Sequence, residues 1–594
     1  MTIVVVVTAS GLPTARRIAD TLDAPLHGRP EGADTTVEDL GVHLRDRFRQ
    51  GSPIVFVGAL GALVRLLASA IGDKAEDPPV VVVAEDGSAV IPLLGGHHGG
   101  NDLARRIGAV LDVVPAITTA SDLRFGVALD APPWGWHLAN PEAYKSFMTR
   151  LLSDGRVRLE GAFPWLDDAR FAIDEGAPLT LRASDRKVEG DRSDTLLYHP
   201  ETLVLGVGCE RNTDPEEVLA LVHETLAEAG LEPESVAVVA SVDVKMDEPA
   251  VHRVAAALGR PARFFTPDRL ERETPRLANP SEIVFREVGC HGVAEAAALA
   301  AAGEGGALVV EKRKSKRATC AIARAPTVID ANNVGAPRGR LFVIGTGPGT
   351  QDWRAPEVDR LVAMSSDLVG YGLYLDLLGQ LADGKTRHGY ALGEERDRVI
   401  AALDLAAGGR TVSLVCSGDP GIYAMASLVF ECLDDIERVD WRRVEVTVSP
   451  GISALQACSA RVGAPLGHDF CTISLSDLLT PWAVIENRIK AAAEGDFVIA
   501  FYNPASMRRR TQLVRALEIL SAHRPPDTPV VLGKSLGRPE ENVTVSPLWD
   551  FDPDSVDMLS LVMVGNSQTR CLGDRVYTPR GYGVARSEQG KAAS

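Results

Sequence analysis

Four loops rich in glycine and proline carry the pattern with the clearest chemical meaning, and each directly follows a strand-like run. They are Gly345-Thr346-Gly347-Pro348-Gly349, Ser417-Gly418-Asp419-Pro420-Gly421-Ile422-Tyr423, Pro450-Gly451-Ile452-Ser453-Ala454 and Tyr502-Asn503-Pro504. Ligands of open α/β sheets bind beyond the carboxyl ends of strands, so these loops are expected to converge on one ligand. Their glycines let the backbone approach it closely, and Asp419 supplies a carboxylate suited to a hydroxyl pair or a cation. No Lys or Arg stands in these loops, which disfavours a phosphate ligand.

The first loop also invites a dinucleotide-binding interpretation, which its spacing disfavours. That fingerprint needs glycines at the first, third and sixth positions, but Thr350 occupies the sixth and Pro348 interrupts the loop. No Lys-Ser or Lys-Thr pair follows, so a Walker A loop is excluded. A dinucleotide-dependent oxidoreductase remains the alternative function. An ordinary tight turn between strand and helix is the alternative for any one loop taken alone.

The elements that must position these loops alternate between short β-branched runs and longer segments of helical period, which is typical of parallel-sheet α/β domains. With 594 residues and 45% hydrophobic content, the chain is long enough for several such domains. The predicted fold class is therefore multidomain α/β. From residue 341 onward, strand-like runs cover 341–344, 411–415, 444–448, 497–501, 530–532 and 559–564.

Composition breaks predict five segments: domains at 1–124, 125–200 and 201–326, a linker at 327–340, and a last domain at 341–594. In the first, 80–83 and 89–93 are predicted to be paired strands. In the second, a helix is expected over 141–153, with Asn140 as its N-cap. In the third, Asp214-Pro215 marks a helix start.

The charge balance limits the partners of the chain. There are 80 acidic against 62 basic residues, for a formal net charge of −18, which argues against nucleic acid or an anionic membrane as a partner. No apolar run approaches the length of a membrane span and no signal peptide is evident, so a soluble cytoplasmic protein is expected. The eight cysteines form no CxxC pair, and no metal site is expected.

The four loops, in the order GTGPG, SGDPGIY, PGISA and YNP, resemble those of the tetrapyrrole methylases, and the resemblance covers 341–594. Residues 369–375 and 463–482 are similar to the precorrin-3B carbon-17 methyltransferases of vitamin B12 synthesis. The resemblance implies a two-lobed class III methyltransferase domain. It also implies methylation of precorrin-3B, or its cobalt form, at carbon 17 with ring contraction to precorrin-4.

The cofactor implied by the resemblance is S-adenosyl-L-methionine, which carries a sulfonium and a ribose diol and no phosphate. The implied cofactor contacts are Gly347, Pro348, Ser417, Gly418, Asp419, Ile422, Ser453, Ala454, Asn503 and Gly533. The family also suggests a homodimer, with a tetrapyrrole as substrate and other cobalamin-pathway enzymes as further partners.

Ring contraction requires a proton to leave a substrate hydroxyl, which points to a general base. His468, Asp469 and Asp477 are the titratable residues in the most distinctive stretch, although Asp477 could instead cap a turn and His468 could be an ordinary loop histidine.

The substrate carries several carboxylates, so basic groups should line its pocket. Arg508, Arg509, Arg510 and Lys534 are the candidates, and a solvated helix start is the alternative for the arginines. Tyr371 and Tyr374, in the matching stretch, are also expected to contact the substrate.

Residues 1–325 resemble the cobalamin-biosynthesis G-type proteins, the cobalt-precorrin-5A hydrolases, in stretches that include 91–101, 135–142, 241–248 and 292–299. Opening a lactone needs an activated water and an oxyanion stabiliser, for which His97, Lys245 and Asp247 are the candidates. Ala84, Gly95 and Asp102 depart from the family pattern. A non-catalytic tetrapyrrole carrier is therefore the competing account of this half.

Overall fold

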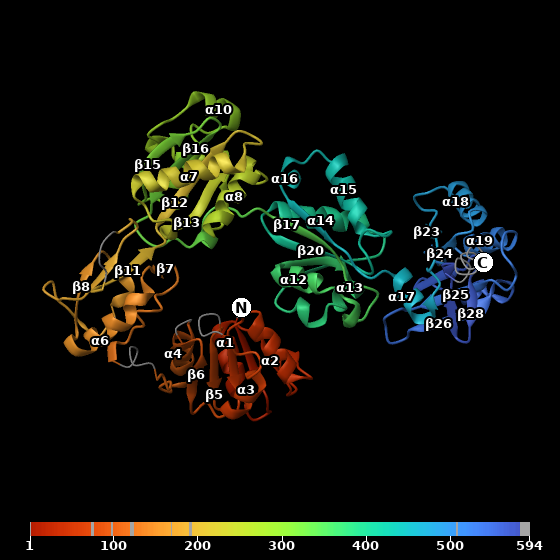
Figure 1. The fold of residues 1–594 in the computed structure, drawn as a ribbon, viewed down its shortest axis with the longest axis horizontal. Coiled ribbons are helices and arrows are strands. Elements are labelled where there is room, and N and C mark those ends of the chain that lie inside the picture. Colours follow the sequence, from red (N-terminus) through yellow and green to blue (C-terminus); the bar gives the residue numbers. More distant parts are fainter. Residues whose placement is uncertain are drawn as a thin grey trace, which may run out of the picture. The chain divides into compact units, whose positions relative to one another are not determined.

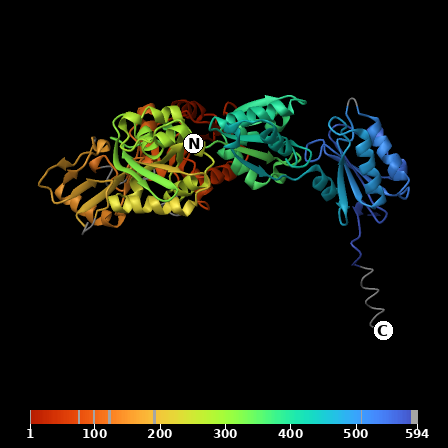
Figure 2. The ribbon, with the colours of Figure 1, turned by 90° about the horizontal axis from the view of Figure 1, so that it is seen from above.

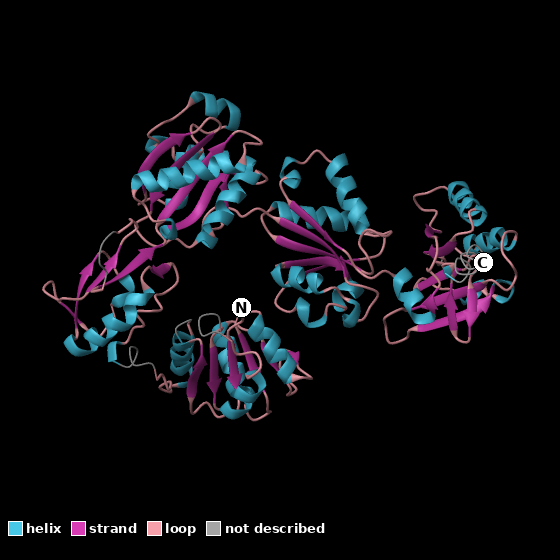
Figure 3. Ribbon diagram, viewed as in Figure 1, coloured by secondary structure: helices cyan, strands magenta, loops and turns pink. Residues whose placement is uncertain are grey.

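The computed structural model describes residues 2–72, 77–96, 99–118, 124–167, 169–188, 193–506 and 509–582. The chain forms two compact units, Met1–Arg338 and Gly339–Ser594. Each unit contains both helices and sheets, and the sheets include parallel strand pairs (Figures 1 and 3). The multidomain α/β class predicted from the sequence is confirmed. No helix in the described ranges is both long and apolar enough to cross a bilayer.

The first sheet has the strand order β3-β2-β1-β4-β5-β6. Its strands are β1 (Ile3–Val6), β2 (Leu26–Gly28), β3 (Thr35–Thr36), β4 (Ile54–Val57), β5 (Val80–Val83) and β6 (Val90–Leu94). The helices are α1 (Leu12–Leu22), α2 (Leu40–Arg49), α3 (Leu60–Leu67) and α4 (Gly100–Leu111). Val4 and Val6 face the core with α1 and α4, while Ile3 and Val5 face the core with α2 and α3. Burial on both faces explains the runs rich in Val and Ile, and the predicted pairing of β5 with β6 is confirmed and is antiparallel.

The second sheet, ordered β7-β11-β10-β8-β9, packs against one long helix. The elements are β7 (Trp136–Leu138), α6 (Tyr144–Asp154), β8 (Arg156–Glu160), β9 (Ala172–Ile173), β10 (Thr180–Ala183) and β11 (Thr195–Pro200). The expected helix is present, but its first turn is a 3₁₀ turn at Pro141–Ala143. Asn140 occupies the N-cap position of this turn as predicted, but its side chain makes no capping hydrogen bond. Its buried side chain instead donates to the Thr195 carbonyl and accepts from the Leu197 amide, which ties this turn to β11.

The third sheet has the order β14-β13-β12-β16-β15. Its strands are β12 (Leu203–Cys209), β13 (Val236–Val242), β14 (Ala262–Phe265), β15 (Ala307–Lys314) and β16 (Ala318–Arg324), and its helices include α7 (Pro215–Ala229), α8 (Pro249–Leu258), α9 (Pro267–Glu271), α10 (Glu282–Val288) and α11 (Ala294–Ala302). Asp214 caps α7 as predicted, because its side chain accepts from the Glu216 amide. Helix α7 lies along one face of the sheet (Figures 1 and 2). On the other face the buried, alanine-rich α11 approaches so closely that a Cβ on Gly206 would lie 1.9 Å from the Ala294 carbonyl oxygen.

The second unit begins with an entirely parallel sheet of order β19-β18-β20-β17-β21. Its strands are β17 (Arg340–Gly345), β18 (Asp367–Tyr371), β19 (Thr386–Tyr390), β20 (Thr411–Cys416) and β21 (Glu445–Ser449). One face packs against α14 (Glu395–Ala407), α15 (Met425–Asp435) and α16 (Val439–Arg442), and the other against α12 (Pro356–Met364) and α13 (Gly372–Asp376). Figure 1 shows these helices above and below the sheet.

A mixed sheet of order β23-β24-β27-β25-β26 completes the second unit, together with a small sheet of order β22-β29-β28. The strands are β22 (Gly463–Ala464), β23 (Phe470–Ser474), β24 (Val498–Tyr502), β25 (Pro529–Lys534), β26 (Asn542–Pro547), β27 (Ser560–Val564), β28 (Arg570–Leu572) and β29 (Arg575–Tyr577). The helices are α17 (Ala454–Val462), α18 (Trp482–Glu494) and α19 (Thr511–Ser521). All six strand-like runs predicted beyond residue 341 are strands. Seven further strands in the described ranges of this unit were not predicted, and two of them, β19 and β26, lie at sheet edges and contain several polar residues.

Asp367, at the start of β18, joins neighbouring strands of the parallel sheet. Its buried carboxylate lies 2.5 Å from Nε of Arg410, which precedes β20, and 2.8 Å from Nε2 of His388 in β19. Burial alone would raise the pKa of Asp367, but the hydrogen bonds from Ser366 and His388 and the charge of Arg410 outweigh it, so the net shift is downward. The carboxylate is therefore ionised in the folded state.

We expect Asp367→Asn to lower the free energy of local unfolding around β18 by about 1–3 kcal/mol, because it leaves buried partners unpaired. Since the folded pKa is depressed, the stabilisation is present above the unfolded carboxyl pKa of about 4 and is lost as pH falls through the lower folded pKa. The variant should lack this acid-dependent loss. Hydrogen exchange of the β18 amides, followed against pH, measures both effects.

Asp376→Asn is the matched control, because the carboxylate of Asp376 is 65% exposed and pairs with Arg387 at the surface. It should change stability by no more than about 0.5 kcal/mol. Equal destabilisation by the two variants would contradict the role given to Asp367.

Candidate functional site

A cavity of about 380 Å³ lies beyond the carboxyl ends of strands in the second unit. Its walls come from the loops after β17, β20, β24 and β25, from the start of α17, and from the residues entering β27. The sequence-predicted residues that line it are Pro348, Tyr374, Ser417, Gly418, Asp419, Ile422, Ser453, Ala454 and Asn503. The four loops singled out in the sequence thus meet at one cavity.

Backbone contacts between glycines bring three of these loops together. A Cβ on Gly451 would lie 2.1 Å from the carbonyl oxygen of Gly418 and 2.7 Å from that of Gly345. Gly347 and Gly418 exchange backbone hydrogen bonds of 3.3 and 2.8 Å, and both have positive φ. Any side chain at Gly451 would have to push the loops apart, so the shape of the cavity depends on the glycines.

The Asp419 side chain, in the cavity wall, holds two of these loops together through hydrogen bonds. One carboxylate oxygen accepts the Gly421 amide at 2.8 Å, and the other accepts the Gly451 amide at 3.1 Å. Each oxygen keeps a further lone pair for a ligand hydroxyl or cation. Asp419 therefore combines a structural role with a place in the cavity wall.

Strained backbone also gathers at this cavity. Tyr423, Asn503 and Ser535 all line it and have φ values of 51°, 50° and 47°, in the left-handed region that such residues seldom adopt. The rings of Tyr423 and Tyr502 lie 5.3 Å apart, and the Tyr502 hydroxyl contacts Ser453 Oγ at 2.9 Å and accepts the Leu455 amide. Such strain persists where surrounding contacts hold it, commonly at functional sites.

Three of the ionisable groups in the cavity wall are neutral. Burial raises the pKa of the Cys416 thiol to about 12 and raises the pKa of the Tyr374 and Tyr502 hydroxyls. At neutral pH all three groups keep their protons, so the tyrosines can donate hydrogen bonds without adding charge.

Comparison with known protein families gives three matches along the chain. The tetrapyrrole (corrin/porphyrin) methylases match residues 340–552, the cobalamin synthesis G N-terminal family matches 42–122, and the cobalamin synthesis G C-terminus family matches 203–323. A precorrin-3B C(17)-methyltransferase from Sinorhizobium is 45% identical over 252 residues, which cover 42% of this chain and 98% of that protein. The chain belongs to the tetrapyrrole methylase family. Its methylase domain is preceded by the two cobalamin synthesis G modules.

Two further proteins are similar to part of this chain. A probable cobalt-factor III C(17)-methyltransferase from Salmonella typhimurium is 46% identical, over 41% of this chain and 99% of that protein. A solved structure of CobE, a protein from the cobalamin biosynthetic pathway, is 42% identical, covers 22% of this chain and 93% of its own, and has a TM-score of 0.21.

Several residues that the sequence suggested for the methylase do not line the cavity. They are Gly347, Gly533, Tyr371, Arg509, Arg510, Lys534, His468, Asp469 and Asp477. Arg508 lies outside the described residues. Gly533 packs in β25, where a Cβ would lie 2.9 Å from Cys458 Sγ. Tyr371 contacts the cavity residue Tyr374 edge-on, with ring centroids 5.3 Å apart.

Arg509 is engaged in holding the loop after β24. Its buried guanidinium donates to the Asn503 carbonyl at 2.8 Å and to Ser476 Oγ at 3.1 Å. The hydrogen bond from Gln512 lowers the pKa of Asp477, which also lies 3.5 Å from Arg509. These contacts position Asn503 in the cavity wall, and they leave Arg509 little freedom to reach a ligand.

His468 and Asp469 lie on the loop between β22 and β23. The side chain of His468 is 51% exposed and that of Asp469 is 79% exposed. The Asp469 amide donates to His468 Nδ1 at 2.8 Å, so the two side chains form a local pair at the surface.

Two arginines in the cavity wall were missed by sequence reasoning. Arg398 of α14 is only 4% exposed, and Arg538 follows β25. Arg398 donates to the Ala391 carbonyl at 3.0 Å and lies 3.9 Å from Met425 Sδ, while its Nε has no hydrogen-bond partner in the described part of the chain. An arginine inside a helix normally indicates a solvated face, and nothing in the sequence marks this one as buried.

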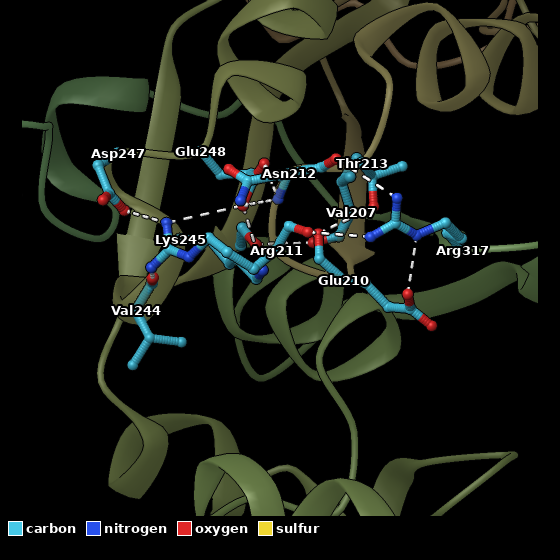
Figure 4. A network of polar contacts seen from close by, with 11 residues as sticks. Val207, Glu210, Arg211, Asn212, Thr213, Val244, Lys245, Asp247, Glu248 and Arg317 are labelled. Atoms are coloured by element: carbon cyan, nitrogen blue, oxygen red, sulfur yellow. Dashed lines mark hydrogen bonds and ion pairs between the residues drawn. The ribbon is translucent and has the colours of Figure 1, made fainter.

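In the first unit the structure places Lys245 and Asp247 at opposite ends of one polar network, in which Arg211 pairs with both Asp247 and Glu248 (Figure 4). Lys245 Nζ lies 3.3 Å from the buried carboxylate of Glu248, whereas Asp247 accepts a hydrogen bond from Arg211 at 2.6 Å. Lys245 lines a second cavity, described below, and Asp247 does not. His97, the third candidate of this half, lies outside the described residues.

The glycine contact in the methylase domain is open to a direct test. We expect Gly451→Ala to destabilise this domain by about 1–3 kcal/mol, because the added methyl must displace the Gly418 carbonyl. Gly389→Ala in β19 is the control, since a Cβ there meets nothing within 4 Å and should be close to neutral. Urea unfolding of the full chain, monitored by hydrogen exchange of the β20 amides, measures the stability of the domain in both variants. If neither substitution changed this stability, the close contact between Gly451 and the Gly418 carbonyl would not be what shapes the cavity.

Proposed function

We propose that the methylase domain transfers a methyl group from S-adenosyl-L-methionine to carbon 17 of precorrin-3B, or of its cobalt form, with ring contraction to precorrin-4. The single observation that carries the proposal is the meeting of the four motif loops at one cavity. The high identity to C(17)-methyltransferases over nearly their whole length supports the position of transfer. The homodimer expected from the resemblance is part of this proposal.

The cavity residues suit the proposed cofactor. When bound, that cofactor supplies an electrophilic methyl group on a sulfonium. Asp419 can accept hydrogen bonds from a ribose diol, and the backbone of the glycine loops allows close approach. Ile422 and Ala454 offer apolar contact. The contribution of the chain is then to hold the reacting atoms in line and to exclude water.

The two unpredicted arginines suit the substrate. Among the described residues no carboxylate pairs with Arg398, yet its guanidinium is buried in the cavity wall. A buried cation without a counterion favours an anionic ligand, and guanidinium groups bind carboxylates through paired hydrogen bonds. We assign Arg398 to a carboxylate of the tetrapyrrole and Arg538 to the same face of the cavity.

Proton removal during ring contraction remains assigned to the stretch that contains His468, Asp469 and Asp477. Full ring-contraction activity of His468→Ala at saturating substrate would remove the histidine from this role. The N-terminal half is proposed to act on, or to bind, a tetrapyrrole of the same biosynthetic route. Release of a two-carbon product from a lactone-bearing intermediate by the full chain would distinguish hydrolysis from binding.

The cofactor assignment predicts that Asp419→Asn weakens binding of S-adenosyl-L-methionine by about tenfold, because one charge-assisted acceptor is lost and the loops are less firmly held. Asp435→Asn, at an exposed position on α15, should leave binding unchanged. Calorimetric titration of the full chain measures both. A thermal shift caused by NADPH and not by S-adenosyl-L-methionine would favour the oxidoreductase alternative.

The substrate assignment predicts that Arg398→Gln raises KM for the tetrapyrrole about tenfold or more while the affinity for S-adenosyl-L-methionine is retained. Arg398→Lys should recover part of the loss, since the charge remains without the paired donors. Arg396→Gln, an exposed position on the same helix, is the control. If Arg398→Gln weakened cofactor binding and left KM for the tetrapyrrole unchanged, Arg398 would be assigned to the cofactor instead of the substrate.

A further inference from the structure

A second cavity, of about 560 Å³, lies in the first unit, within the domain of the third sheet. It is found where β12 and β13 end, between the β15–β16 hairpin, α10 and the start of α11. This is again the carboxyl end of parallel strands, where α/β sheets bind ligands. Figure 4 shows part of its polar wall around Arg211, Lys245 and Arg317.

The walls of this cavity are basic although the chain as a whole is acidic. Its cations are Arg211, Lys245, Lys312, Lys314, Lys316 and Arg317. The carboxylates in the walls are Glu210, Glu287 and Glu295. In a protein with a formal net charge of −18, this local excess of positive charge is opposite in sign to the average surface. It would attract an anion into the cavity.

The carboxylates in and beside the walls do not neutralise all of these cations. Glu295 is buried and accepts the amides of Asn279 and Lys312, each at 2.9 Å. Arg317 pairs with Glu210 at 2.8 Å, and Lys245 pairs with Glu248.

Lys314 and Lys316 differ from these paired cations. Both are exposed at the hairpin, and their ammonium groups make no ion pair or hydrogen bond in the parts of the chain that the structure describes, although the charge of Lys316 helps to lower the pKa of Glu217. Nearby, Lys312 donates to the Asn279 carbonyl at 2.7 Å. The hairpin therefore carries positive charge available to a ligand.

The wall formed by α10 is apolar except for the exposed carboxylate of Glu287. Ile283, Val284 and Val288 of α10 line the cavity together with Val293, and Ile283 is 67% exposed. A large aliphatic side chain left open beside lysines suits a ligand that has both an apolar body and anionic groups. Small inorganic anions would use the cations and leave this wall uncovered.

We infer that this cavity binds a polycarboxylate with a broad apolar body, held by the hairpin lysines at its edge and by α10 on its face. This is the chemistry of the tetrapyrrole in the proposed function, and the choice of ligand class rests on that proposal. The cavity would make the N-terminal half a second tetrapyrrole site, separate from the methylase cavity and formed by other residues.

The test uses the full chain and uroporphyrin, whose carboxylates surround an apolar ring, with mesoporphyrin as a probe that carries fewer carboxylates. Fluorescence titration should show that uroporphyrin binds more tightly and that salt weakens its binding. In the double variant Lys314→Gln/Lys316→Gln, binding should weaken about fivefold or more, because two unpaired cations are removed. Affinity for S-adenosyl-L-methionine should not change.

Arg313→Gln/Arg286→Gln is the matched control. This double variant also removes two positive charges, one from the same hairpin and one from α10, but neither arginine lines the cavity. Arg313 pairs with Glu228, and Arg286 donates to the Glu282 carbonyl. If both double variants weakened uroporphyrin binding equally, the effect would come from the net charge of the chain and the inference would be overturned.

The remaining outcomes separate this inference from the methylase proposal. Porphyrin binding that is unchanged in the lysine variant but lost in Arg398→Gln would place all binding in the methylase cavity and overturn the second site. No uroporphyrin binding by the unaltered chain would also overturn it. Selective loss of binding in the lysine variant would support it even if the chain transferred no methyl group, a result that would contradict the proposed function alone.

Discussion

The contact of glycine backbones at Gly345, Gly418 and Gly451 is the constraint on which the methylase cavity depends. Parallel strands deliver their loops to one end of the sheet, but the loops can share a small cavity only if their backbones touch. With the glycines in contact, Asp419 can accept amides from its own loop and from the next one. The left-handed Tyr423, Asn503 and Ser535 then complete the wall, and their strain is offset by the packing around them.

The placement of positive charge also depends on local structure, because cations line both cavities although the chain has a formal net charge of −18. An acidic chain that binds an acidic ligand must gather cations at particular places, and two such places are present. In the methylase cavity a buried arginine, Arg398, has no carboxylate partner among the described residues. In the N-terminal half the lysines of the β15–β16 hairpin border an apolar wall. The two cavities differ in cation, burial and shape, so variants in one leave the other intact.

The core strands and the motif loops could be predicted because their signals are local. The runs that form β17, β20 and β24 are buried on both faces, and their largely apolar sequence follows directly from that burial. Local signals misled where a side chain had two possible partners. Asn140 precedes a proline and a helix, the usual pattern of an N-cap, but it is buried against β11, and the sheet amides take its hydrogen bonds. Arg509 reads as part of a solvated basic run, yet it is buried and donates to the Asn503 carbonyl.

By itself the sequence determined the α/β class, the order of strands and loops in the second unit, the family of the methylase half, and most of the motif-loop residues that line its cavity. Each of these depends on residue type and spacing along a single segment. Only the tertiary structure decided which cations line a cavity, because Arg398, Arg538 and the hairpin lysines become neighbours of a cavity through packing between distant segments. The free energy of a charged group depends on its burial and its partners, and neither is written in the residues beside it.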